Sequence, residues 1–241
     1  MTHHAALRSA FVFATLLLSA TAQAQLFRAY LAPSGDDMNA CTLPAPCRLL
    51  PAALAAVADG GEIWMLDSAN YNTGPVNITK SVTILAVPGA LGSVLATGGN
   101  AINIATAGVK VALRNLVIVP QPGMGGTGGI NMIAGASLTV ENCLIANLPG
   151  TGISVTTAAS VRVTDTTIRG NGIYGLLIQD GARLRHARHD KRELRHRHHG
   201  VRGSTQYHYC RHCRLDAECE QRWGRRVFEQ CNRTGNSHSP Q

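Results

Sequence analysis

The residues with the clearest potential for chemistry gather near the C-terminal end of the chain. Cys210 and Cys213 form a C-x-x-C pair that is followed by Cys219 and Cys231, with several histidines nearby. Thiolates and imidazoles in such an arrangement are typical zinc ligands. The arginines around Trp223 are of the kind that binds nucleic acid. A zinc- or nucleic-acid-binding module is therefore one interpretation of this segment.

These residues lie beyond an abrupt change in composition near Ala182. Residues 1–182 carry eight Lys and Arg and eight Asp and Glu, whereas residues 183–241 carry fourteen and six and account for the whole net charge of +8. Residues 183–241 also hold eight of the ten histidines and contain no Ile or Met. With so little apolar surface to offset chain entropy, we expect this basic tail to be largely disordered. Because the net positive charge lies in the tail, it gives no reason to expect a specific nucleic-acid partner.

A shifted reading frame would explain the tail. When the frame moves forward by one nucleotide, His and Tyr codons yield Thr or Ile, and Cys and Arg codons yield residues such as Ala, Val and Gly. With GC-rich codons, residues 207–226 then read TTTAATADSTLSANSGGVV, which resembles the composition before Ala182. We hypothesise that a frameshift converted further repeats into residues 183–241. The cysteine and histidine clusters would then be by-products, and we assign no catalytic residue, cofactor or metal.

Before the tail, the sequence repeats with a period of about 23 residues. Ile102–Ile118, Ile130–Ile145 and Ile153–Ile168 align with one another, and a fourth copy opens at Leu176. Each copy contains three short apolar or alternating runs separated by turns of small residues, a pattern typical of strands. Three such short strands cannot bury an apolar face alone, so we expect the units to stack around a continuous core.

One polar position recurs in the repeat, at Asn115, Asn142 and Asp165. We expect these three side chains to stack as a polar ladder at a corner of each coil, where they satisfy backbone groups. Glu141 lies in the copy next to Asp165 but one place out of register, so the two do not pair as catalytic carboxylates would. A Gly-rich insertion at residues 121–127 separates the first two copies and is the candidate functional surface among the loops.

The N-terminus has the features of a secretory signal. Phe11–Ala20 is an apolar run shorter than the roughly 20 residues of a membrane span, and small residues precede a cleavage point after Ala24. We expect a periplasmic or secreted protein with no membrane span after cleavage, an uncleaved anchor being the alternative. In that oxidising compartment, Cys41 and Cys47 are expected to form a disulfide around a short Pro-rich loop, with two free thiols as the alternative.

Together these features resemble the exported right-handed parallel β-helix proteins of the pectin-lyase-like superfamily, over about residues 28–182. The entry segment Tyr30–Asp37 adds to the resemblance, because the Cys41/Cys47 loop and then a helical run over Leu49–Ala58 follow it. The resemblance implies an all-β fold, a right-handed parallel β-helix of ~23-residue coils with a short N-terminal capping helix. The expected organisation is a signal peptide (1–24), a cap with the disulfide and the helix (25–60), the coils (61–182) and the basic tail (183–241).

Polysaccharide lyases and hydrolases on this fold use clustered carboxylates, often with Ca²⁺. The repeats show no such cluster, so we expect an exported protein without an assignable catalytic site that binds a surface or has a structural role. A polysaccharide or cell-surface glycan is the expected partner. Two alternatives stay open: a carbohydrate-active enzyme whose catalytic coils are lost in the tail, and the zinc- or nucleic-acid-binding module.

Overall fold

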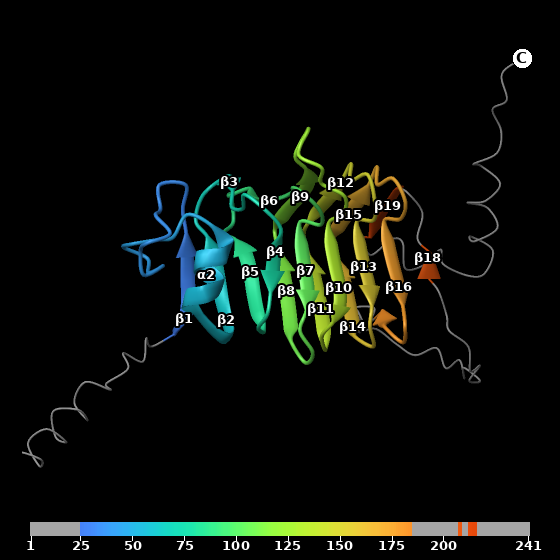
Figure 1. Ribbon diagram of the computed structural model, residues 1–241, viewed down its shortest axis with the longest axis horizontal. Helices are drawn as coiled ribbons and strands as arrows, with labels where there is room; N and C mark the ends of the chain where they lie inside the picture. The colour runs from blue at the N-terminus through green and yellow to red at the C-terminus, as the bar shows by residue number, and fades with distance from the viewer. Residues whose placement is uncertain (1–24, 185–206, 209–211, 216–241) are drawn as a thin grey trace, which may run out of the picture.

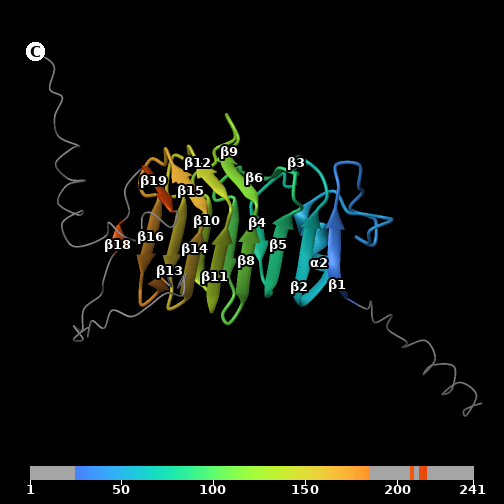
Figure 2. The ribbon, with the colours of Figure 1, turned by 180° about the vertical axis from the view of Figure 1, so that it is seen from behind.

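The computed structural model is a solenoid in which the strands of successive coils lie side by side (Figures 1 and 2). It describes residues 25–184, 207–208 and 212–215. The first sheet has the order β1 (Leu26–Leu31), β2 (Val57–Met65), β5 (Val82–Ala86), β8 (Lys110–Arg114), β11 (Ser137–Glu141), β14 (Ser160–Thr164) and β17 (Arg183–Leu184).

Two further sheets complete each coil. The second sheet contains β4 (Val76–Ile78), β7 (Ile102–Ala105), β10 (Ile130–Ala134), β13 (Ile153–Thr156), β16 (Leu176–Gln179) and β18 (Tyr207–His208). The third contains β3 (Ala69–Asn70), β6 (Gly92–Ala96), β9 (Leu116–Pro120), β12 (Leu144–Ala146), β15 (Thr166–Arg169) and β19 (His212–Leu215). The chain passes from the second sheet to the first and then to the third in every full coil.

The register of the strands follows the sequence repeat. Ile130 pairs with Ile153 and Ile153 pairs with Leu176, an interval of 23 residues each time, and all three side chains are buried. Strands β1 to β17 pair in parallel within their sheets, and alternate residues point into one continuous apolar core. The predicted all-β fold, a parallel β-helix with coils of this length, is confirmed.

A short helix covers the N-terminal end of the core. α2 (Leu50–Ala56) buries Leu50, Ala53 and Leu54 and lies against β1, β2 and β4. The sequence predicted a helix over residues 49–58, but Val57 already has extended backbone angles, and β2 begins there because its side chain is fully buried in the core. The capping role of the helix agrees with the prediction, and only its end is shorter.

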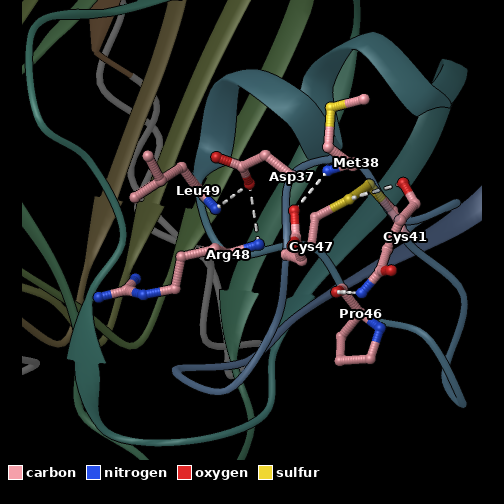
Figure 3. Close-up of a disulfide and its surroundings, with 9 residues drawn as sticks. Asp37, Met38, Cys41, Pro46, Cys47, Arg48 and Leu49 are labelled. Carbon is pink, nitrogen blue, oxygen red and sulfur yellow. Dashed lines mark hydrogen bonds between the residues drawn. A yellow bond between two sulfur atoms is a disulfide. The ribbon is translucent and has the colours of Figure 1, made fainter.

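The segment before the helix is closed by a disulfide and held at the start of the helix by a carboxylate (Figure 3). Cys41 and Cys47 form the disulfide, and both are buried. One carboxylate oxygen of Asp37 accepts hydrogen bonds from the backbone N–H groups of Arg48 (2.9 Å) and Leu49 (2.7 Å). Leu49 has no side-chain cap of its own, so Asp37 supplies acceptors for N–H groups next to the first turn.

The two ends of the coil stack differ from the sequence-based outline. Leu26–Leu31 was assigned to the cap, yet it forms β1, the first strand of the first sheet, which pairs with β2. At the other end, β17 continues the pattern to Leu184, two residues past the predicted boundary. The described parts of the tail form β18 and β19, which pair antiparallel with β16 and β15. The rest of the tail and the predicted signal peptide lie outside the described residues.

Candidate functional site

A single residue turns the chain between the first and third sheets in three successive coils. Asn115, Asn142 and Asp165 occupy this corner with φ angles of 56°, 52° and 49°. This left-handed region is unfavourable for most side chains, and Asn and Asp tolerate it best among the non-glycine residues. The backbone geometry therefore explains why this position carries Asn or Asp in each copy of the repeat.

The two amides of this ladder are hydrogen-bonded along the solenoid axis. The Nδ2 group of Asn115 lies 3.1–3.4 Å from the carbonyl oxygens of Ala86, Val87 and Ala90 in the preceding coil. The Nδ2 group of Asn142 donates to Oδ1 of Asn115 at 3.2 Å. Asp165 continues the column at the next coil and is exposed. The structure thus places the three residues of the predicted ladder in one column.

The residues that follow the corner point into the core and form a second, buried column. Cys143 and Thr166 hydrogen-bond there to backbone groups, including a contact from the Cys143 N–H to Thr166 Oγ1 (3.3 Å). Burial raises the pKa of the Cys143 thiol to about 11, although hydrogen bonds to its sulfur partly oppose this shift. The thiol is therefore neutral at physiological pH and has the character of a packing residue rather than a nucleophile.

A groove of about 450 Å³ runs beside the ladder across several coils. Its floor is the outer face of the third sheet, where Val117, Leu144 and Thr167 stand in register on β9, β12 and β15. The ladder forms the other part of the lining, together with Leu116, Cys143 and the exposed Leu91. The sequence predicted the ladder but not this groove. The sequence does contain the floor residues as a repeated position, two residues after each ladder residue.

Several carboxylates outside the groove are bonded within the protein. Besides Asp37, the carboxylates of Asp36 and Asp59 accept backbone N–H groups of Met38 and Ser81, at 2.9 and 2.7 Å. These acids stabilise turns of the solenoid.

Glu141 lies on the outer face of the first sheet between two arginines. Its carboxylate contacts the guanidinium of Arg114 at 3.0 Å and that of Arg162 at 4.0 Å. The register pairs Glu141 with Thr164 and not with Asp165, as the alignment of the repeats predicted. The two acids consequently lie on different surfaces, one among arginines and the other in the groove.

A second row of amides lies on the outer face of the second sheet, and the sequence analysis missed it. Asn77, Asn103 and Asn131 occupy equivalent positions of β4, β7 and β10. The Nδ2 group of Asn103 donates to Oδ1 of Asn77, and its own Oδ1 accepts from Asn100, both at 3.2 Å. The signal was the Asn that follows the first apolar residue in these runs. This row follows the strands themselves, and its residues are not part of the groove lining.

The Gly-rich insertion packs against the neighbouring turn of the solenoid. Met124 accepts a hydrogen bond from the N–H of Gly98 (2.7 Å), and the N–H of Thr127 donates to Gly99 (2.8 Å). A side chain at Gly126 would collide with the carbonyl group of Ala96, so this close approach requires glycine. The insertion is thus a bonded loop rather than a free one, and it does not line the groove.

The four cysteines of the alternative zinc-binding module lie mostly outside the described residues. Cys213 belongs to β19, whereas Cys210, Cys219 and Cys231 are not described. Within the part of the chain that the structure describes, no group of three His, Cys, Asp or Glu side chains is placed to hold a metal ion.

The one helix among the described residues is too short to cross a membrane.

Comparison with known proteins identifies the region that holds the ladder. Residues 92–190 match the family model described as a right handed beta helix region, which is consistent with the pectin-lyase-like superfamily. Searches of the curated proteins and of the solved structures found no match. The matched segment contains all three ladder residues and the floor of the groove, and Leu91 lies directly before it.

Proposed function

The chain is a right-handed parallel β-helix protein, and we propose that it is an exported binding protein whose groove holds an extended polysaccharide chain. The observation that carries this proposal is the repetition of one surface in successive coils. Each coil contributes a polar corner residue and a residue of the groove floor, at the spacing of neighbouring strands, roughly 4.8 Å. A polymer that runs along the solenoid axis would meet equivalent groups again and again.

The chemistry of the lining suits a carbohydrate. Asn142 and Asp165 offer oxygen atoms to hydroxyl groups, and Thr167 adds a hydroxyl of its own. Val117 and Leu144 supply apolar surface against which the C–H faces of sugar rings pack. A mixture of apolar floor and convergent polar groups is typical of ligand sites.

Binding is favoured over hydrolysis by the distribution of acids. Glycoside hydrolysis uses two carboxyl groups on opposite sides of the scissile bond. Asp165 is the single carboxylate among the described residues that line the groove, while Glu141 lies on another face among arginines. The Cys41–Cys47 disulfide supports export, because disulfides persist in oxidising compartments.

Binding to polysaccharides tests the proposal. The full chain is mixed with soluble and insoluble glycans, and binding is measured by affinity electrophoresis and pull-down. Thr167→Met fills the groove floor without adding charge and should weaken binding about tenfold or more. Thr139→Met places the same side chain on the outer face of the first sheet, at another half-buried strand position, and should leave binding unchanged.

Two results would overturn the proposal. Absence of binding to every glycan would reject a carbohydrate ligand, and equal binding by both methionine variants would place the site elsewhere. Release of reducing ends or unsaturated products from a glycan by the full chain would establish the enzymatic alternative instead.

A further inference from the structure

We infer that the groove selects a neutral, hydroxyl-rich glycan and discriminates against polymers of uronic acids. This inference rests on the proposed function and adds a chemical preference to it. It follows from the direction of the hydrogen bonds in the ladder and from the charge of the residue that ends it.

The orientation of each amide in the ladder is set by the coil before it. Asn115 points its Nδ2 group at the carbonyl oxygens of Ala86, Val87 and Ala90, so its Oδ1 atom faces the next coil. That oxygen can only pair with a donor, and the Nδ2 group of Asn142 fills this role. The donors of both amides are thus directed along the ladder and into the protein.

The groups that remain for a ligand are mostly hydrogen-bond acceptors, and the Thr167 hydroxyl can donate or accept. Asn142 is exposed in the groove lining, and Asp165 presents a carboxylate one coil further on. The described lining contains no Lys, Arg or His. Sugar hydroxyl groups can donate hydrogen bonds to the Asn142 and Asp165 oxygens, whereas carboxylates cannot.

A uronate polymer would meet repulsion in this groove. Its carboxylates repeat with every sugar, so a chain that lies along the groove brings negative charge close to Asp165. No described cation in the lining offsets this like-charge contact, and the apolar floor lowers the local screening. The arginines of the neighbouring face, Arg114 and Arg162, are already paired with Glu141. Arg169 is exposed two residues beyond Thr167 on β15, on the same sheet face but outside the groove lining.

The experiment compares two soluble polymers, a mixed-linkage glucan and polygalacturonate, with the full chain and two variants. Asp165→Asn removes the groove charge, keeps a residue that tolerates the left-handed corner and extends the amide ladder. Asp180→Asn is the matched control, because Asp180 is also exposed, has a φ of 53° and lies outside the groove lining. Affinities are measured at low and high ionic strength, and urea unfolding checks that each variant is folded.

We expect the unmodified chain to bind the glucan at least about tenfold more tightly than polygalacturonate at low salt, with a smaller ratio at high salt. Asp165→Asn should raise the affinity for polygalacturonate several-fold and so reduce the ratio of the glucan affinity to the polygalacturonate affinity, because it removes the groove charge. Asp180→Asn should change neither affinity.

The failures of the two proposals are distinguishable. Absence of binding to the glucan, with binding to another glycan of the wider panel, would reject the neutral preference alone, and absence of binding to every glycan would reject the proposed function. Tight binding of polygalacturonate that is insensitive to Asp165→Asn would reject the neutral preference and leave glycan binding in place. Stronger binding of a polycationic chitosan than of the glucan would likewise overturn the preference for a neutral chain.

Discussion

The Nδ2 group of Asn142 donates a hydrogen bond to Oδ1 of Asn115 at 3.2 Å, and both residues turn the chain with positive φ angles. One residue type thus performs two tasks at the same place. It adopts the backbone conformation that the corner requires, and its amide links consecutive coils along the solenoid. The two contributions can be separated by substitution.

Asn142→Ala should destabilise the protein by roughly 2 kcal/mol, because it removes a hydrogen bond and places a Cβ-bearing residue without local polar compensation in the left-handed region. Asn142→Gly should cost about half as much, since glycine adopts this conformation freely and only the amide contact is lost. The free energy of unfolding from urea titration measures both. Equal losses for the two variants would show that the backbone conformation contributes nothing at this corner.

The Cys41–Cys47 disulfide should stabilise the entry segment by about 2 kcal/mol, since the loop it closes is short. Adding a reductant should therefore lower the urea midpoint of the unmodified chain. The Cys41→Ser/Cys47→Ser variant should start at the lower midpoint and show no response to reductant. A reductant effect of the same size in that variant would assign it to another cysteine.

Cys143 should make the protein less stable in alkali. Its pKa is raised by burial to about 11, so the folded state holds the proton longer than the unfolded state, whose thiol has an ordinary pKa. Stability from the neutral thiol is complete below the unfolded pKa and is lost as the pH rises toward 11, by up to about 2–3 kcal/mol. Between pH 8 and 11, Cys143→Ala should therefore lose less stability than the unmodified chain. Parallel decreases in the two proteins would contradict this role.

The strand register and the ladder could be predicted from the sequence, because both follow from the period of the repeat. The 23-residue interval between Ile130 and Ile153 gives the strand register directly, and the same alignment finds Asn115, Asn142 and Asp165. The end of α2 was beyond this reasoning because Val57 fits a helix stripe and a buried strand equally well.

The groove escaped prediction for a related reason. One part of its lining consists of outward side chains such as Leu144, an apolar residue that the sequence of a short strand would assign to the core. Another part is Leu91, which belongs to a turn with no counterpart in the other copies. Which face of a three-residue strand points outward is decided by the register of the whole coil. That register becomes visible once the corner residues are fixed in space.

The frame hypothesis predicts where the coil pattern ends. β17 pairs Ser160 with Arg183 and Val161 with Leu184, so the last described coil still follows the repeat at this point. If a nucleotide was gained or lost, accurate sequencing of the gene near codons 180–186 should reveal a change that restores the repeat downstream. An intact frame, with peptides of the basic tail found by mass spectrometry, would reject a sequencing error and leave a genuine tail or mutation.

The C-terminal edge of the solenoid should be a site of self-association once the tail is removed. β19 pairs with β15 and β18 pairs with β16, both antiparallel, so these two segments cover the last strands of the third and second sheets. An unpaired strand edge is a template for another chain. A chain that ends at Leu184 should therefore form dimers or larger species at concentrations where the full chain does not, as measured by size-exclusion chromatography with light scattering.

A charge on the uncovered edge provides the control. In the shortened chain, Leu177→Lys places a positive charge on the edge strand β16, which opposes the pairing of another strand beside it, and should restore a smaller species. The same substitution at Thr139, on the central strand β11, should not, because that strand is already paired on both sides. If the shortened chain has the same size distribution as the full chain, β18 and β19 do not protect the edge, and the final coil is kept apart by its own side chains.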